Sequence, residues 1–122
     1  MSLEEELDEL RELGYSITPV VQPDGWTMVV FDGFPLPSGY NRKTSRLLVK
    51  VPPGHPSAKL DMFWMDSELK LESGNLPQGC SQEQALGMMW LRFSWHASNW
   101  NPGYDNLRTY LSFIKTRLKN RS

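Results

Sequence analysis

Apolar residues recur at helical spacing at both ends of the chain. At the amino terminus, Ser2 and Glu5 have the spacing of a capping box, and Gly14 is placed to end a short helix. The apolar side of this helix would consist of Leu3, Leu7 and Leu10. Towards the carboxyl terminus, a Pro-Gly pair at 102–103 interrupts the chain, and Asp105 is placed as a cap or first-turn acid. A longer helix follows, and its apolar side would consist of Leu107, Tyr110, Leu111, Ile114 and Leu118.

Between these helices the pattern changes to short β-prone runs separated by turn residues. The runs predict four strands, over Ile17–Val21, Trp26–Phe31, Arg46–Val51 and Asp61–Met65. The prolines within 34–37 cannot donate to a β-ladder, so we expect an edge or a loop there. Since the connections are short and no long crossover separates the runs, the strands are expected to form an antiparallel meander.

A long irregular segment, 66–81, follows the strands and precedes a further apolar pattern. Residues 82–95 are interpreted as a helix, because apolar residues recur there at helical spacing: Leu86, Met89, Trp90 and Phe93. The expected fold class is therefore α+β, with one antiparallel sheet, an amino-terminal helix and carboxy-terminal helices. The length of the chain, 122 residues, suits a single domain, 1–122.

Composition narrows the classes of function. The formal net charge is −1, so no global field would attract nucleic acid or an anionic membrane surface, and we expect neither as a partner. One cysteine and two histidines provide neither a disulfide framework nor a metal-ligand cluster, and we expect no metal and no cofactor. The acidic start has no signal-peptide pattern, and we expect a cytoplasmic protein.

Three side chains are candidates for chemistry. Ser94 and His96 form an S-x-H pair in which the imidazole would act as general base for the hydroxyl, with Asp105 or Asp61 orienting the ring. On a helix the two side chains would point in different directions, whereas an extended segment would place them on one face. The structural alternative is a histidine bonded to the backbone and a serine that ends a helix. Cys80 is the only thiol, but no neighbouring base would lower its pKa.

Several short motifs, taken in order, resemble the ubiquitin-conjugating enzyme (UBC) superfamily. The run 47–56 resembles its proline-rich turn of the form P-x-x-Y-P, with His55 at the aromatic position, and W-x-P recurs at 100–102 before the last helix. A narrower set is similar to the prokaryotic ubiquitin-conjugating-like family E: Y-N-R at 40–42, D-M-F-W at 61–64, R-F-S-x-H at 92–96 and W-x-P-G-x-D-x-L at 100–107. The chain departs from the superfamily at its active site, because residues 91–96 contain no cysteine and the His-Pro-Asn element is absent.

This resemblance implies a UBC-like fold and a role in a bacterial ubiquitin-like modification pathway. The implied partners are a ubiquitin-like protein, an adenylating activating enzyme and a JAB-type isopeptidase. Two readings stay open. In one, the chain is an acyl-transfer enzyme without the usual cysteine, and Ser94 and His96 form the catalytic site and carry the ubiquitin-like protein as an oxyester. In the other, it is a non-catalytic module that scaffolds the activating enzyme or the ubiquitin-like protein. We expect Trp90 and Trp100 to be mostly buried, and Trp95 is the better candidate for exposure to a partner.

Overall fold

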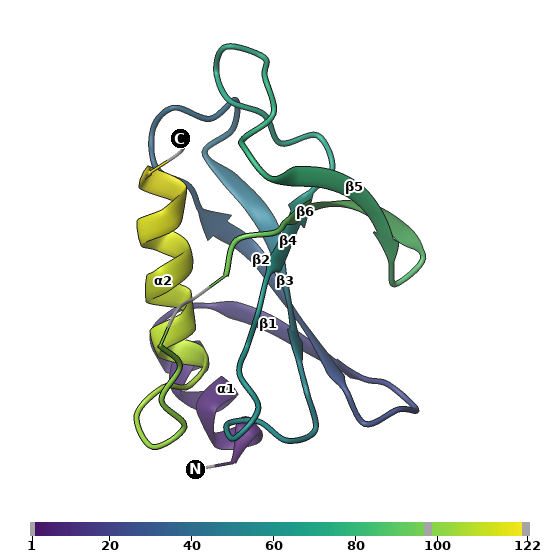
Figure 1. The fold of residues 1–122 in the computed structure, drawn as a ribbon, viewed down its shortest axis with the longest axis vertical. Helices are drawn as coiled ribbons and strands as arrows, with labels where there is room; N and C mark the ends of the chain where they lie inside the picture. The colour runs from purple at the N-terminus through teal and green to yellow at the C-terminus, as the bar shows by residue number, and fades with distance from the viewer. Residues whose placement is uncertain (1, 97–98, 121–122) are drawn as a thin grey trace.

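The computed structural model describes residues 2–96 and 99–120. Its elements are α1 (Leu3–Glu12), β1 (Ser16–Val21), β2 (Thr27–Pro35), β3 (Thr44–Val51), β4 (Phe63–Asp66), β5 (Cys80–Ala85), β6 (Met88–Phe93) and α2 (Leu107–Lys119). The strands form one antiparallel sheet in the order β1-β2-β3-β4-β6-β5 (Figure 1). The predicted α+β class and the antiparallel sheet are confirmed.

The two terminal helices begin as capped elements. Ser2 Oγ accepts the backbone N–H of Glu5, and the Glu5 carboxylate accepts the N–H of Ser2, so the predicted capping box is confirmed. The cap predicted for α2 is wrong by one residue, since Asn106 Oδ1 accepts the N–H of Thr109. Asp105 instead accepts the N–H of Asn101 at 2.8 Å, so its carboxylate stabilises the corner that precedes the helix.

The predicted helix over 82–95 is wrong, because this segment is the β5–β6 hairpin. Leu86 and Gly87 have φ angles of 53° and 75°, and two successive positive φ values are typical of the type I′ turn that joins paired strands. Within β6, Trp90 packs on one face of the sheet, whereas Leu91 and Phe93 pack on the other. The apolar residues therefore alternate along a strand, and their helical spacing is coincidental.

The prolines within 34–37 were expected in an edge or loop, and the structure places Pro35 at the end of β2, opposite Thr44 of β3. The last pair between β1 and β2 joins Ser16 to Asp32. Beyond that pair β2 has no strand on its β1 side, so it tolerates a residue without an N–H there.

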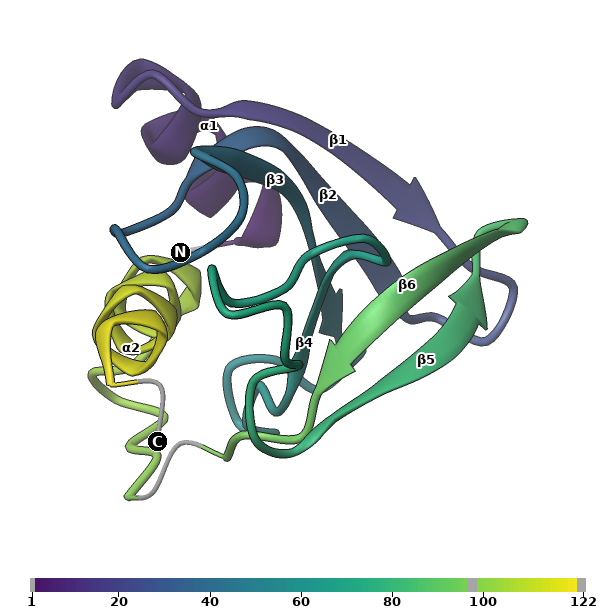
Figure 2. The same ribbon diagram turned by 90° about the horizontal axis from the view of Figure 1, so that it is seen from above.

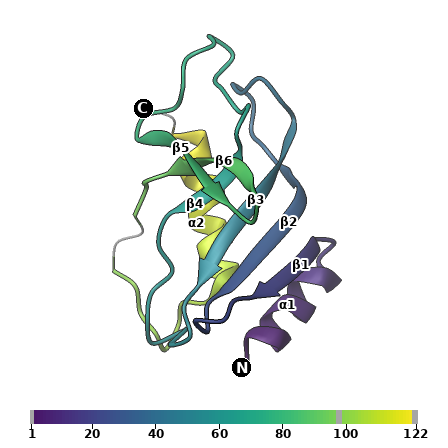
Figure 3. The same cartoon turned by 90° about the vertical axis from the view of Figure 1, so that its right-hand side faces the viewer.

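Two apolar clusters lie on opposite faces of the sheet. The larger one fills the space between the sheet and α2, which lies along one face, while α1 lies beside β1 (Figures 2 and 3). The smaller one centres on Leu48, Trp64 and Trp90, on the face that α2 does not cover. Within residues 2–96 and 99–120, neither helix is long and apolar enough to cross a membrane.

Candidate functional site

Ser94 and His96 lie on the segment that continues β6 towards α2, and Trp95 fixes its path. The Ser94 N–H donates to the carbonyl of Gly79 at 3.0 Å, and the Trp95 indole N–H donates to the carbonyl of Gln78 at 2.7 Å. Trp95 is only 6% exposed and Trp100 is partly exposed, so the expectation that Trp95 is the better candidate for exposure is wrong. Its ring packs edge-on against two phenylalanines of the core, Phe63 and Phe93. The buried side chain of Trp95 therefore separates Ser94 from His96 along the chain.

His96 is paired with Asp61, one of the two acids expected to orient it. The distance from His96 Nδ1 to Asp61 Oδ1 is 2.6 Å, and the histidine side chain is 57% exposed. Since a carboxylate accepts hydrogen bonds, this contact places a proton on Nδ1 and leaves Nε2 able to accept one when the ring is neutral. The other expected acid, Asp105, is used at the corner before α2. The structure therefore contains an Asp–His pair.

The backbone next to Asp61 is held by α2. Met62 has a φ of 58°, which is rare for a residue with a side chain, and its carbonyl accepts the Tyr110 hydroxyl at 2.6 Å. Burial, reinforced by the negative charge of Asp61, raises the pKa of Tyr110 well above its usual range, so the phenol stays protonated and donates. The hydrogen bond fixes the turn that presents the Asp61 carboxylate to His96.

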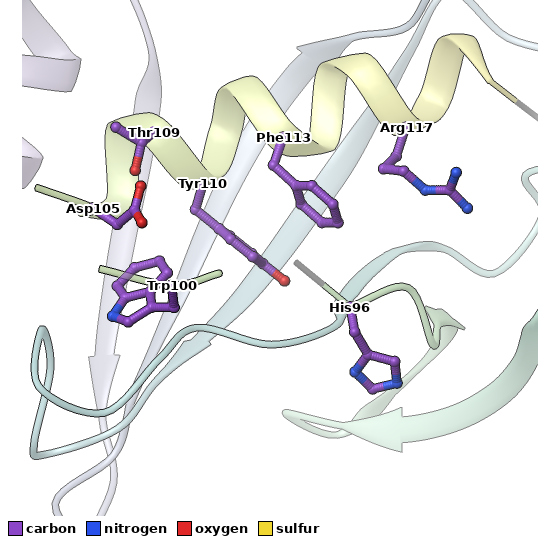
Figure 4. Close-up of a pocket in the computed structure, with 7 residues that line it drawn as sticks. All are labelled: His96, Trp100, Asp105, Thr109, Tyr110, Phe113 and Arg117. Atoms are coloured by element: carbon purple, nitrogen blue, oxygen red, sulfur yellow. The ribbon is translucent and has the colours of Figure 1, made fainter. Parts of the chain in front are cut away.

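An open groove of about 380 Å³ lies between α2 and the segment that carries His96. Tyr110, Phe113 and Arg117 project into it from successive turns of the helix, and His96 and Trp100 lie opposite them (Figure 4). His96 and Arg117 are near one end, and Trp100 and Asp105 are near the other (Figure 4). Aromatic rings therefore form the middle of a groove with polar ends.

The corner at 99–103 is tied to the proline-rich turn by Trp100. Its indole N–H donates to the carbonyl of Pro56 at 2.8 Å, and the ring is partly buried, in line with the expectation that it is mostly core. His55 lies beside this ring, with the two centroids 6.1 Å apart. The W-x-P motif and the proline turn are thus parts of one local structure, which supports the base of the groove.

Glu6 is a buried charged residue that the sequence analysis did not select. It is 6% exposed, its Oε2 lies 3.0 Å from His55 Nε2, and its Oε1 accepts the N–H of Leu107 at 2.8 Å. The carboxylate therefore joins α1, the proline turn and the first turn of α2, where a negative charge also suits the helix dipole. In the sequence, only the position of Glu6 beside Leu7 in the helical pattern indicates that it is buried. The acidic residues before it make that indication easy to miss.

Ser94 does not complete a triad in this structure. It is partly buried, whereas His96 is exposed. Within the described residues, no hydrogen bond joins the Ser94 hydroxyl to His96, and Ser94 is not among the residues that line the groove. Trp95 is buried in the core and lies between Ser94 and His96, both of which are less buried.

The remaining candidate, Cys80, begins β5 and is partly buried. Burial raises the pKa of its thiol to about 12, so the thiol is protonated near neutral pH and is a weak nucleophile. Its Sγ lies 3.9 Å from the carbonyl of Gln78. Among residues 2–96 and 99–120, no group of three or more His, Cys, Asp or Glu side chains is arranged to hold a metal ion.

Comparison with known proteins gives one result that bears on this geometry. Neither a curated protein nor a solved structure matches the chain. Among protein families, the match spans residues 3–121, and so includes the proline turn, the Asp61–His96 pair and α2. The chain belongs to prokaryotic E2 family E.

Proposed function

We propose that this E2-like protein acts in a bacterial ubiquitin-like modification pathway and carries the ubiquitin-like protein as an oxyester on Ser94. The observation that supports this proposal is the 2.6 Å contact between Asp61 and His96. His96 lies in the segment before W-x-P, where members of the UBC superfamily have their cysteine. An imidazole with a carboxylate on Nδ1 is the arrangement that activates a hydroxyl nucleophile.

The proposed transfer uses the same three residues. Ser94 Oγ attacks the carbonyl carbon of the thioester formed between the activating enzyme and the ubiquitin-like protein; a C–O bond forms and the C–S bond breaks. His96 Nε2 takes the proton of the hydroxyl and returns it to the departing thiolate, while Asp61 stabilises the imidazolium. The mechanism requires the bound partner to bring Nε2 to Ser94 Oγ, because catalytic hydrogen bonds often form only in the complex.

The second candidate function is a non-catalytic module that holds the ubiquitin-like protein or its activating enzyme. It is favoured by a specific observation: among the described residues, Ser94 has no hydrogen bond to His96. The protonated state of Cys80 also argues against a thioester on the chain's only thiol. Under either function we propose the same partners, namely an adenylating activating enzyme, a ubiquitin-like protein and a JAB-type isopeptidase, and a cytoplasmic location.

The test incubates the protein with the activating enzyme, ATP and the ubiquitin-like protein of the same pathway. The oxyester proposal predicts an adduct that survives reducing agent, is cleaved by hydroxide and is lost in Ser94→Ala. Ser112→Ala is the matched control, because this serine lies exposed on α2 and should leave the adduct unchanged. An adduct that persists in Ser94→Ala would exclude Ser94, and binding without any adduct would support the module.

A further inference from the structure

A second pocket, of about 300 Å³, lies on the face of the sheet that α2 does not cover. Its apolar part consists of Met62 and Trp64, from the smaller apolar cluster, and of Trp26 from the turn between β1 and β2. The other residues that line it are all charged: Lys50, Lys59, Asp61, Glu83 and Arg92. The volume is at the lower end of the range for ligand pockets, so the pocket suits one compact molecule.

The charges of this pocket leave one cation without a partner. Glu83 is shared by two of the cations, since Lys50 Nζ lies 3.6 Å from its Oε1 and Arg92 Nη1 lies 3.1 Å from its Oε2. Asp61 is already engaged in the Asp–His pair. Lys59 is exposed and, within residues 2–96 and 99–120, has neither a hydrogen bond nor an ion pair. The lining therefore offers one free positive charge, and that charge suits an anionic group.

Trp26 supplies the aromatic surface that a ligand can reach. The Trp64 residue is only 3% exposed, and Lys50 Nζ lies 4.2 Å from the centroid of its ring, so that ring is covered. Trp26 is 39% exposed, and its backbone is fixed in the turn. Its N–H donates to the Asp24 carboxylate at 3.0 Å, and its carbonyl accepts the N–H of Gln22 at 2.7 Å. An exposed indole on a fixed backbone is a surface on which a planar ring can stack.

We propose that this pocket binds a small planar aromatic anion of the nucleoside monophosphate class, with the base stacked on Trp26 and the phosphate bound by Lys59. Stacking on an aromatic side chain and a charge-assisted hydrogen bond are the two contacts that the lining leaves available. One unpaired cation balances one phosphate, which favours a monophosphate over a chain of phosphates in a pocket that also contains two carboxylates. The inference does not depend on the proposed function, because the site uses neither Ser94 nor an activating enzyme.

The test titrates the isotopically labelled protein with three probes, AMP, adenosine and inorganic phosphate, and follows the backbone amide signals by NMR. AMP should bind at millimolar concentration or below, and the signals around Trp26 and Lys59 should move most. Adenosine lacks the phosphate and inorganic phosphate lacks the ring. Each should therefore bind about tenfold more weakly than AMP.

Two variants separate the contacts. Lys59→Gln removes the charge and should lower the affinity for AMP about tenfold, to that of adenosine. Trp26→Leu removes the ring and should lower it by a similar factor, to that of inorganic phosphate. Lys43→Gln and Tyr104→Leu are the matched controls, because they change an exposed cation and an exposed ring outside the pocket, and both should keep the affinity for AMP.

Failure of AMP to bind at millimolar concentration would overturn the proposal. So would an affinity for AMP equal to that for adenosine or for inorganic phosphate, or full affinity in either pocket variant. Because Lys59 and Trp26 are both exposed, the variants should fold, and circular dichroism checks this. Lys59→Arg keeps the charge and should retain the binding of AMP, so its loss in a folded Lys59→Arg variant would also count against a charge-based site.

These outcomes are independent of the test of Ser94. Binding of AMP without an adduct would leave this inference standing. An adduct on Ser94 in a protein that does not bind AMP would overturn the inference alone.

Discussion

Replacing Trp100 by alanine tests the local structure that supports the groove. A buried tryptophan removes about 150–250 Å² from water, equivalent to about 4–6 kcal/mol at 25 cal/mol/Å². Because the Trp100 ring is partly exposed, we assign about 3 kcal/mol to its packing. Loss of the hydrogen bond to Pro56 adds about 1 kcal/mol. Trp100→Ala should therefore lower the free energy of unfolding by about 4 kcal/mol, within the range for aromatic truncation.

The measurement is urea denaturation followed by circular dichroism, which does not depend on the indole that is removed. The slope against urea should stay unchanged, so that the shift in midpoint reports stability. Trp26→Ala is the control, because Trp26 is 39% exposed in the turn between β1 and β2, and it should cost less than about 2 kcal/mol. A loss below about 1 kcal/mol for Trp100→Ala, or equal losses for the two variants, would refute the reasoning.

Two further predictions concern Tyr110 and Cys80. Tyr110→Phe leaves the Met62 carbonyl without its donor, so we expect a loss of about 1–2 kcal/mol in urea denaturation, with no change for the exposed Tyr104→Phe; equal stability of the two variants would contradict the role of this bond. Since the raised pKa of Cys80 keeps its thiol protonated, iodoacetamide should alkylate the folded protein at pH 8 much more slowly than the urea-unfolded chain, and equal rates would mean that burial does not protect the thiol. The raised pKa of Cys80 also makes the stability of the fold depend on pH. The unfolded chain releases the thiol proton at lower pH than the folded one, so this group favours unfolding as the pH rises from about 9 towards 12.

The elements that the sequence predicted correctly are those whose signals are local. The capping box at Ser2 and Glu5 and the apolar stripe that ends at Leu118 depend on spacing within one helix. The β5–β6 hairpin was missed because its turn is Leu86-Gly87, without the Asn-Gly or Asp-Gly pair that usually marks a type I′ turn. In the absence of that mark, the spacing of four apolar residues favoured a helix.

The candidate site was predictable only in part, because its geometry depends on contacts between distant segments. Asp61 was one of two acids considered for His96, and 35 positions separate the pair, so only the fold decides between them. Trp95 was the better candidate for exposure when the segment was interpreted as a helix. In an extended segment alternate side chains point to opposite sides, and Trp95 points into the core. Arg117 belongs to an ordinary basic helix end, and its place in the groove follows from the packing of α2.

The bond from Glu6 to the N–H of Leu107 joins positions 101 residues apart. A ribosome synthesises α1 before α2, so the Glu6 carboxylate has no Leu107 N–H to accept until that residue has emerged. This contact of Glu6 can therefore form only after residue 107 has been synthesised. Contacts over such a long separation also slow the search for the native state, because a large loop must close before they form.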